Sequence, residues 1–309
     1  MKNIGIIGSG SFGCALAYTF SKRNNIKIWS YTKEETDSIN NNHFCLLQPS
    51  IVLNDKIKCF QDYEEVIKDS DIIILVSPSN VFRKTCQDIK KYITDQEIVI
   101  ASKGMEKDRL LSMIVEEELG LSPSVISGPS FAFELASSEP VFVDYAGNKE
   151  IINDLQCDNF SLFYQEDIIG VQIGAALKNV IGLAVGVAEG VGLKNSAISY
   201  LISKGLEEIK IIGVSLGASE NTFYGLSGLG DLLTTSYGDN SRNKRAGVLL
   251  GMGYSKEEIF KEIGMVMEGF ESLINAKLII SKYQLNCPMI NNLYEIIYHE
   301  GDVHNIINF

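Results

Sequence analysis

The chain has 309 residues, 45% of them hydrophobic and 21% charged, which is ordinary for a globular protein long enough to form two domains. Its 39 acidic and 27 basic side chains give a net charge of -12. Broad binding to nucleic acid or to an anionic membrane requires basic surface, so this composition argues against both kinds of partner. Any anionic ligand must be held locally by a few positioned groups.

The first half of the chain alternates short apolar runs with amphipathic stretches. Residues 3–8 predict a strand, 11–23 a helix and 26–31 a second strand, which together form a βαβ unit. Further runs, apolar on both faces, follow at 71–77, 97–102, 124–128 and 140–146. Such strands are typical of a parallel sheet with helices on both sides. We therefore expect an α/β fold with a Rossmann-type doubly wound sheet over residues 1–167.

A glycine-rich motif, GSGSFG at residues 8–13, lies between the first predicted strand and helix. In dinucleotide-binding folds the first glycine permits the turn, the second lets a pyrophosphate approach the backbone, and the third lets the helix pack on the strand. The helix N-terminus adds free N–H groups. We predict that Gly8, Gly10 and Gly13 bind NAD or NADP; a glycine turn kept for packing alone is the alternative.

The sequence leaves the choice between NAD and NADP open. An acid at the end of the second strand would hold a ribose hydroxyl of NAD, but Ser30, Tyr31 and Thr32 stand there. Glu34 falls inside the next predicted helix. Lys33 is either a partner for the NADP 2′-phosphate or an ordinary solvated lysine.

Strand patterns stop near residue 168, and helical patterns continue to the end of the chain. They cover residues 169–189, 195–217, 242–251, 255–264, 269–283 and 288–298. We therefore predict that residues 168–309 form an all-helical C-terminal domain. The apolar stretch at 170–192 contains Lys178, whose charge is costly in lipid, so we predict a buried helix and no membrane span.

Gly174, Lys178, Gly182 and Gly186 recur at every fourth position of this stretch, and so they share one helix face. Such a stripe either lets another helix pack closely or leaves room for a ligand. A lysine there loses hydration, which lowers its pKa and favours proton transfer near neutral pH. A buried structural lysine paired with a carboxylate is the alternative.

The six cysteines are scattered without a CxxC pair, and the three histidines are too dispersed for a metal site. We therefore predict reduced thiols and no metal. The N-terminal segment has no signal-peptide pattern, and we expect a cytoplasmic protein.

Six motifs run in order over nearly the whole chain: GSGSFGCALA (8–17), ASKGME (101–106), SGPSFAFELA (127–136), GAALKNVIGLAVGVAEGVGLKNSA (174–197), GLSGLGDLLTTSYGDNSRNKRAG (225–247) and VMEG (266–269). This combination closely resembles bacterial NAD(P)-dependent glycerol-3-phosphate dehydrogenase. The resemblance implies interconversion of dihydroxyacetone phosphate and sn-glycerol 3-phosphate by hydride transfer, with the product feeding phospholipid synthesis. It implies NAD or NADP as cofactor and a small phosphorylated triose as substrate. For the oligomeric state, our hypothesis is a homodimer.

The resemblance also implies roles for individual residues. Lys178 is the catalytic proton donor and acceptor, and Lys103 stabilises the charge that develops on the substrate. Besides the three glycines, the implied cofactor site comprises Ser11, Phe12, Tyr31, Lys103, Ala132, Arg242, Val266 and Glu268. The implied substrate site comprises Lys103, Gly128, Ser130, Lys178, Asp231, Ser241, Arg242 and Asn243.

A basic cluster of Arg242, Lys244 and Arg245 stands out in this acidic chain. Asn240 or Ser241 is the expected cap of a helix, whose free N–H groups and the Arg242 guanidinium then converge on a substrate phosphate. We expect Lys244 and Arg245 to be solvated neighbours.

Asp231 precedes this cluster and cannot itself favour a phosphate. It accepts a hydrogen bond from a substrate hydroxyl or holds a pocket lysine, and a simple turn acid is the alternative. The family usually has Trp where this chain has Phe12, a basic or imidazole side chain near Tyr31, and a Pro-Gly turn within residues 42–50. The last two differences bear on the adenosine end of the cofactor.

Other dehydrogenases of the same architecture are competing functions, but they do not need the pairing of GLGD with SRN. A cofactor-sensing protein without turnover is the alternative from a different class. Lys178 and Lys103 argue against it, because sensing requires no proton donor.

Overall fold

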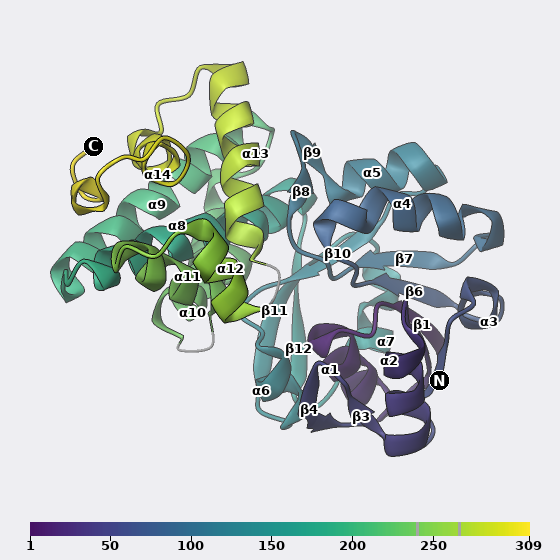
Figure 1. The fold of residues 1–309 in the computed structure, drawn as a ribbon. Coiled ribbons are helices and arrows are strands. Elements are labelled where there is room, and N and C mark those ends of the chain that lie inside the picture. The colour runs from purple at the N-terminus through teal and green to yellow at the C-terminus, as the bar shows by residue number, and fades with distance from the viewer. Residues whose placement is uncertain (239–240, 265–266) are drawn as a thin grey trace. The chain divides into compact units, whose positions relative to one another are not determined.

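The computed structural model describes residues 1–238, 241–264 and 267–309 (Figure 1). Internal contacts divide the chain into two units. The first comprises Met1–Lys103 with Leu111–Ile168, and the second comprises Gly104–Leu110 with Ile169–Phe309.

The first unit is built on an eight-stranded sheet with the order β12-β11-β10-β7-β6-β1-β2-β5. Its strands are β1 (Asn3–Ile7), β2 (Asn25–Trp29), β5 (Lys58–Phe60), β6 (Ile72–Leu75), β7 (Glu97–Ile100), β10 (Ser124–Ser127), β11 (Val141–Ala146) and β12 (Phe160–Gln165). All neighbours are parallel except β10 and β11, which are antiparallel. The Rossmann-type sheet is confirmed. The apolar runs do not predict the antiparallel pairing of β10 with β11.

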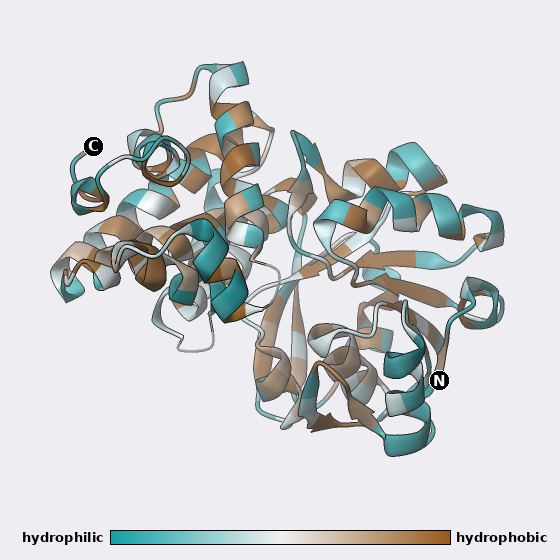
Figure 2. Ribbon diagram, in the orientation of Figure 1, coloured by the Kyte–Doolittle hydropathy of each residue, from teal (hydrophilic) through white to brown (hydrophobic). Residues whose placement is uncertain are grey.

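Helices cover both faces of this sheet, as alternation along its strands requires. Ile72 and Ile74 of β6 belong to a core cluster with α1 (Ser11–Phe20) and α6 (Ala132–Ala136), while Ile73, between them, points to the other face. The remaining helices of the unit are α2 (Lys33–Asp37), α3 (Tyr63–Ile67), α4 (Ser79–Ile89), α5 (Leu111–Leu119) and α7 (Ile152–Leu155). Figure 2 shows hydrophobic strands and a hydrophilic α2, none of whose residues is buried.

The segment 42–50 contributes to a small hairpin of β3 (Phe44–Cys45) and β4 (Gln48–Val52). Sequence patterns predict neither this hairpin nor β5 and β12, because β3 and β5 are short and all four strands are only partly apolar.

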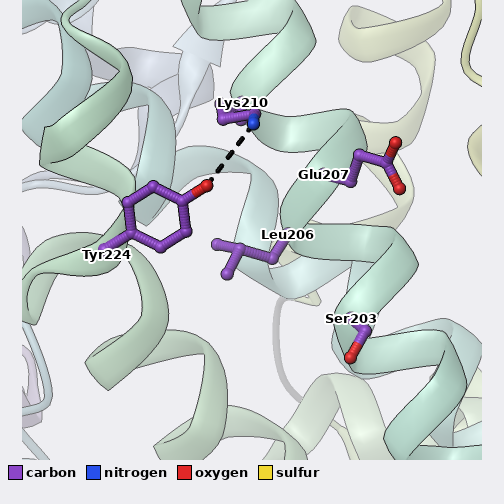
Figure 3. Close-up of a pocket in the computed structure, with 5 residues that line it drawn as sticks. All are labelled: Ser203, Leu206, Glu207, Lys210 and Tyr224. Atoms are coloured by element: carbon purple, nitrogen blue, oxygen red, sulfur yellow. Dashed lines mark hydrogen bonds between the residues drawn. The ribbon is translucent and has the colours of Figure 1, made fainter.

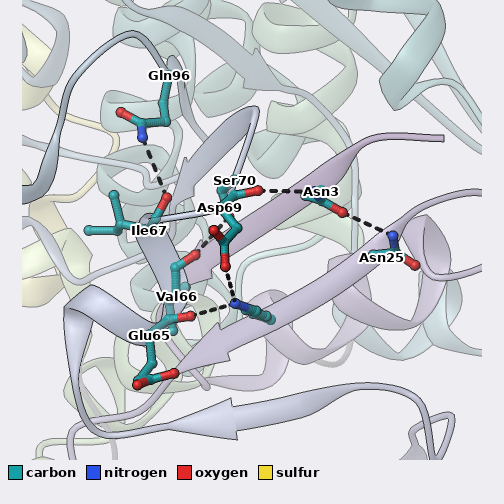
Figure 4. Close-up of polar contacts among 9 residues, drawn as sticks. Asn3, Asn25, Glu65, Val66, Ile67, Asp69, Ser70 and Gln96 are labelled. Atoms are coloured by element: carbon teal, nitrogen blue, oxygen red, sulfur yellow. Dashed lines mark hydrogen bonds and ion pairs between the residues drawn. The ribbon is translucent and has the colours of Figure 1, made fainter.

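Polar side chains tie together the amino ends of β1 and β2, opposite the glycine motif. Asn25 Nδ2 donates to Asn3 Oδ1 (2.9 Å), and Asn3 Nδ2 donates to the Asp69 carbonyl (3.0 Å; Figure 4). A pocket of about 430 Å³ near this edge is lined partly by Asp71 and Asp95 and by none of the predicted site residues. The predicted cofactor residues of the first unit lie instead after the carboxyl ends of β1, β2, β7 and β10.

The second unit is mainly helical, as predicted. Its helices are α8 (Ile168–Gly190), α9 (Asn195–Ser215), α10 (Asp231–Tyr237), α11 (Arg242–Gly251), α12 (Lys256–Ile263), α13 (Glu268–Tyr283) and α14 (Pro288–Tyr298). It also includes a hairpin of β8 (Met105–Glu106) and β9 (Arg109–Leu110), so it is not all-helical. Asn275 Nδ2 on α13 donates to the Met105 carbonyl (3.1 Å) and holds this hairpin. Helix α8 is long and apolar enough to span a membrane, but 89% of its most apolar window is buried in the protein.

Candidate functional site

The glycine motif forms the turn from β1 into α1. Gly8 has φ of 129°, and a methyl group there would lie 2.9 Å from the Val76 carbonyl oxygen. A methyl group on Gly13 would overlap the Gly8 carbonyl, whereas one on Gly10 would meet no atom within 4 Å. Gly8 and Gly13 are thus required by packing, and Gly10, the N-cap of α1, faces open space.

Three predicted site residues meet at the carboxyl ends of β7 and β10. Lys103 Nζ donates to the Gly128 carbonyl (3.3 Å), and Ser130 Oγ donates to the same oxygen (3.0 Å). A methyl group on Gly128, which has φ of 153°, would lie 2.9 Å from Val143 Cα. The adjacent strands therefore bring an ammonium group and a hydroxyl group together.

Ser77 is a residue at this edge that sequence reasoning missed. It follows β6, and its buried Oγ has no hydrogen-bond partner among the residues that the structure describes. Ser102 Oγ donates to the Ser77 carbonyl (2.7 Å) and fixes the backbone there. Nothing in the local sequence distinguishes this serine from an ordinary loop residue.

The other predicted cofactor residues of the first unit differ in exposure. Ser11 is the first residue of α1, and the partly buried Phe12 and Ala132 pack against the same core cluster. Tyr31 is 81% exposed, and its ring centroid lies 6.4 Å from that of Trp29 in a T-shaped arrangement.

Lys178 and Asp231 form a buried ion pair in the second unit. Lys178 lies on α8 and is 7% exposed, and Asp231 begins α10 and is fully buried. Lys178 Nζ donates to Asp231 Oδ1. Asp231 thus contacts a lysine, as one of its two predicted roles requires, and the same pair is what the alternative of a buried structural lysine predicts.

The glycine stripe of α8 packs against neighbouring helices. A methyl group on Gly182 would lie 2.9 Å from Thr235 Cγ2, and one on Gly186 would lie 2.8 Å from Gly247 Cα. Close helix packing, one of the two predicted uses of the stripe, is therefore confirmed for these glycines. The contact also places the start of α11 beside Gly182, because a methyl group there would lie 3.9 Å from Ser241 Oγ. Gly182 is one helical turn from Lys178.

Ser241 is the N-cap of α11, and its Oγ accepts a hydrogen bond from the Lys244 N–H (3.3 Å). Asn243 Oδ1 accepts from the Gly269 N–H (2.9 Å), which ties α11 to the start of α13. Arg242, between them, is exposed. Arg242 is thus the exposed first residue of α11, between two residues whose side chains are fixed by hydrogen bonds.

The start of α13 also contacts α8. Asn179 Nδ2 donates to Glu268 Oε2 (3.1 Å), so Glu268 lies beside the residue that follows Lys178. Val266 and Asn240, the remaining predicted cofactor residue and the alternative cap, lie outside the described residues.

The prediction that Lys244 is simply solvated is wrong. Its Nζ lies 3.0 Å from Glu189 Oε1, and only 14% of its side chain is exposed. Arg245 is exposed, as expected. The reason is the close packing of α8 on α11, which brings Glu189 next to Lys244.

A separate pocket of about 260 Å³ lies against α9 and is lined by Ser203, Leu206, Glu207, Lys210 and Tyr224 (Figure 3). Lys210 Nζ donates to Tyr224 Oη across it (3.4 Å). None of the predicted site residues lines this pocket. In the described parts of the chain, no group of three or more His, Cys, Asp or Glu side chains is placed to hold a metal ion.

Comparison with known proteins identifies the family to which this chain belongs. Residues 3–151 match the model of the NAD-dependent glycerol-3-phosphate dehydrogenase N-terminus, and residues 167–308 match that of its C-terminus. The chain belongs to this dehydrogenase family. A glycerol-3-phosphate dehydrogenase [NAD(P)+] of Fusobacterium nucleatum is 38% identical over 100% of this chain and 96% of its own.

Further relatives of the dehydrogenase family agree. A protein of the same name from Clostridium acetobutylicum is 36% identical over 98% of this chain and 94% of its own. The crystal structure of glycerol-3-phosphate dehydrogenase from Coxiella burnetii superposes with a TM-score of 0.95 at 30% identity, covering 99% of this chain and 97% of that one. The family resemblance of the sequence motifs is thereby confirmed.

Proposed function

We propose that this chain is an NAD(P)-dependent oxidoreductase that interconverts dihydroxyacetone phosphate and sn-glycerol 3-phosphate and supplies glycerol 3-phosphate for phospholipid synthesis. The observation that carries the proposal is the buried Lys178–Asp231 pair, one helical turn from the place where α11 begins with Arg242. This arrangement supports a proton donor next to a phosphate-binding group, and a protein that only senses a cofactor needs neither.

The glycine motif fits the dinucleotide. Only Gly10 of its three glycines has open space where a side chain would stand, which suits close approach of a pyrophosphate to the backbone. The following helix has ten residues, and its first N–H groups are available to phosphate oxygens. We assign Gly8, Gly10, Ser11, Phe12 and Gly13 to this role.

The other cofactor contacts that we propose are Tyr31, Lys103, Ala132, Arg242, Val266 and Glu268. The nicotinamide supplies the hydride when the cofactor is bound. In the first unit, Lys103 brings positive charge to the substrate, and the Gly128 backbone and Ser130 hydroxyl are its further contacts.

In the second unit, Lys178 Nζ gives a proton to the substrate carbonyl oxygen and takes it back in the reverse reaction. Asp231 accepts from Nζ and holds it in place, which supports this role. Arg242 binds the substrate phosphate through its planar guanidinium, and Ser241 and Asn243 shape the same helix start. Because the phosphate is remote from the reacting carbon, its binding energy contributes to orientation.

We further propose that residues 1–167 form the dinucleotide-binding domain and 168–309 the substrate domain. A cytoplasmic location is supported by six buried cysteines that are all free, since thiols persist in a reducing compartment. A homodimer remains a prediction, which light scattering coupled to size-exclusion chromatography tests.

Steady-state assays with NADH or NADPH test the proposed activity. Dihydroxyacetone phosphate should be reduced with either family cofactor, and unphosphorylated dihydroxyacetone should be a poor substrate. A protein that binds cofactor but reduces neither ketone would be a sensor and would contradict the proposal.

A further inference from the structure

No acidic residue stands at the end of β2 in the sequence, but the fold brings a carboxylate to that position from the next helix. Glu35 lies in α2, and its side chain folds back to the end of β2. Its Oε2 accepts hydrogen bonds from Ser30 Oγ (2.8 Å) and Ser9 Oγ (3.0 Å), and the two serine oxygens are themselves 3.0 Å apart. Ser9 stands between Gly8 and Gly10, so the carboxylate directly contacts the glycine motif.

Glu35 is held there from both sides of the contact. Ser9 is 5% exposed and Ser30 is fully buried, so neither hydroxyl is free to turn to bulk water. On α2, the Glu35 N–H donates to Oγ1 of the N-cap Thr32 (3.2 Å), which fixes the start of the helix. The two serine hydroxyl groups therefore hold one oxygen of the Glu35 carboxylate in a fixed position.

This position matters because the two cofactors differ at one point. In dinucleotide-binding folds the group at the end of the second strand faces the adenosine ribose, where NAD has a 2′-hydroxyl and NADP a 2′-phosphate. A carboxylate accepts a hydrogen bond from the hydroxyl and repels the phosphate. Lys33, on the same helix, would act in the opposite sense, but it is exposed and its charge is more strongly screened.

We propose that Glu35 is a specificity-determining residue that favours NAD over NADP, an inference that rests on the proposed function. The carboxylate reaches the ribose position from α2 by way of Ser30, in place of an acid on the strand itself.

Binding of each cofactor, measured by calorimetric titration without substrate, tests this inference. We expect wild type to bind NADH at least about tenfold more tightly than NADPH. Glu35→Gln should reduce that ratio at least about fivefold, chiefly by tightening NADPH. Glu34→Gln is the matched control, since it removes an exposed neighbouring acid that does not contact Ser9 or Ser30, and its ratio should stay within about twofold of wild type.

Other results would separate the two proposals. If Glu35→Gln weakens both cofactors equally, Glu35 only supports the glycine motif and the inference is overturned. It is also overturned if wild type prefers NADPH. If wild type binds neither cofactor, the proposed function itself fails.

Wild-type protein alone gives a second test that does not depend on the variant folding. Raising the salt concentration from about 0.05 M to about 0.5 M screens repulsion, so the NADPH affinity should rise relative to that of NADH. A fall in this ratio would mean that attraction, as by Lys33, dominates, and would overturn the inference.

Discussion

Breaking the Lys178–Asp231 pair should affect stability and turnover in separable ways. In Lys178→Met the Asp231 carboxylate stays fully buried without its lysine. Loss of one partner of a buried ion pair costs about 3–5 kcal/mol of unfolding free energy, because the remaining charge is desolvated. Replacing both, as in Lys178→Met with Asp231→Leu, should recover most of that loss. Urea unfolding measures the free energy of unfolding of the wild type, of Lys178→Met and of the double variant.

Turnover should follow a different pattern across the same variants. If Lys178 is the proton donor, both variants without it should lose about 10²- to 10⁴-fold in kcat, even when the double variant is stable again. NADH binding should survive in the stable double variant, because the glycine motif is in the other unit. The control is Lys244→Met, which also breaks an ion pair but leaves a Glu189 side chain that is 32% exposed; it should cost less stability than Lys178→Met and should leave kcat nearly unchanged.

A folded variant without Lys178 that keeps more than about a tenth of the wild-type kcat would refute the catalytic role. The lysine would then be structural, which is the alternative that its burial and its carboxylate partner allow.

Three further substitutions test other parts of the account. Gly10→Ala should fold normally and lose at least about tenfold in NADH affinity, whereas Gly13→Ala should lose about 1–3 kcal/mol of stability, because its methyl group would overlap the Gly8 carbonyl; thermal unfolding and NADH titration distinguish them. Arg242→Lys should lower kcat/KM for dihydroxyacetone phosphate by an amount that corresponds to about 1.5–3 kcal/mol of transition-state free energy, and Arg245→Lys should leave kcat/KM unchanged. Equal effects of the two substitutions on kcat/KM would indicate a general electrostatic effect. Glu208→Gln should destabilise the protein by about 1–3 kcal/mol, because Glu208 accepts the Met289 and Ile290 N–H groups at the start of α14. An unchanged urea midpoint would contradict that structural role.

Local patterns predicted much of the fold. The strand at 3–8, the glycine motif and the helix from residue 11 appear within a few residues of their predicted bounds, since each depends on neighbours in the chain. Helix α8 was equally clear, because its apolar pattern is long. Helix α10 was missed because the glycines before Asp231 obscure its start.

Pairings between distant residues were harder to predict. The sequence predicted that Asp231 could hold a pocket lysine but did not identify Lys178 as that lysine, because 53 positions separate them and a charge pattern does not specify a contact. The glycine stripe of α8 allowed either a helix or a ligand until α11 was placed on it. Glu35 was missed entirely, since its contact with Ser9 joins residues 26 positions apart in the chain.

The central claim is most directly tested by following NADH absorbance as the purified protein reduces dihydroxyacetone phosphate. The account predicts NADH oxidation that depends on the phosphorylated ketone, yields sn-glycerol 3-phosphate and reverses when product and NAD⁺ are supplied. A folded protein that binds NADH but leaves it unoxidised in the presence of dihydroxyacetone phosphate would contradict the claim.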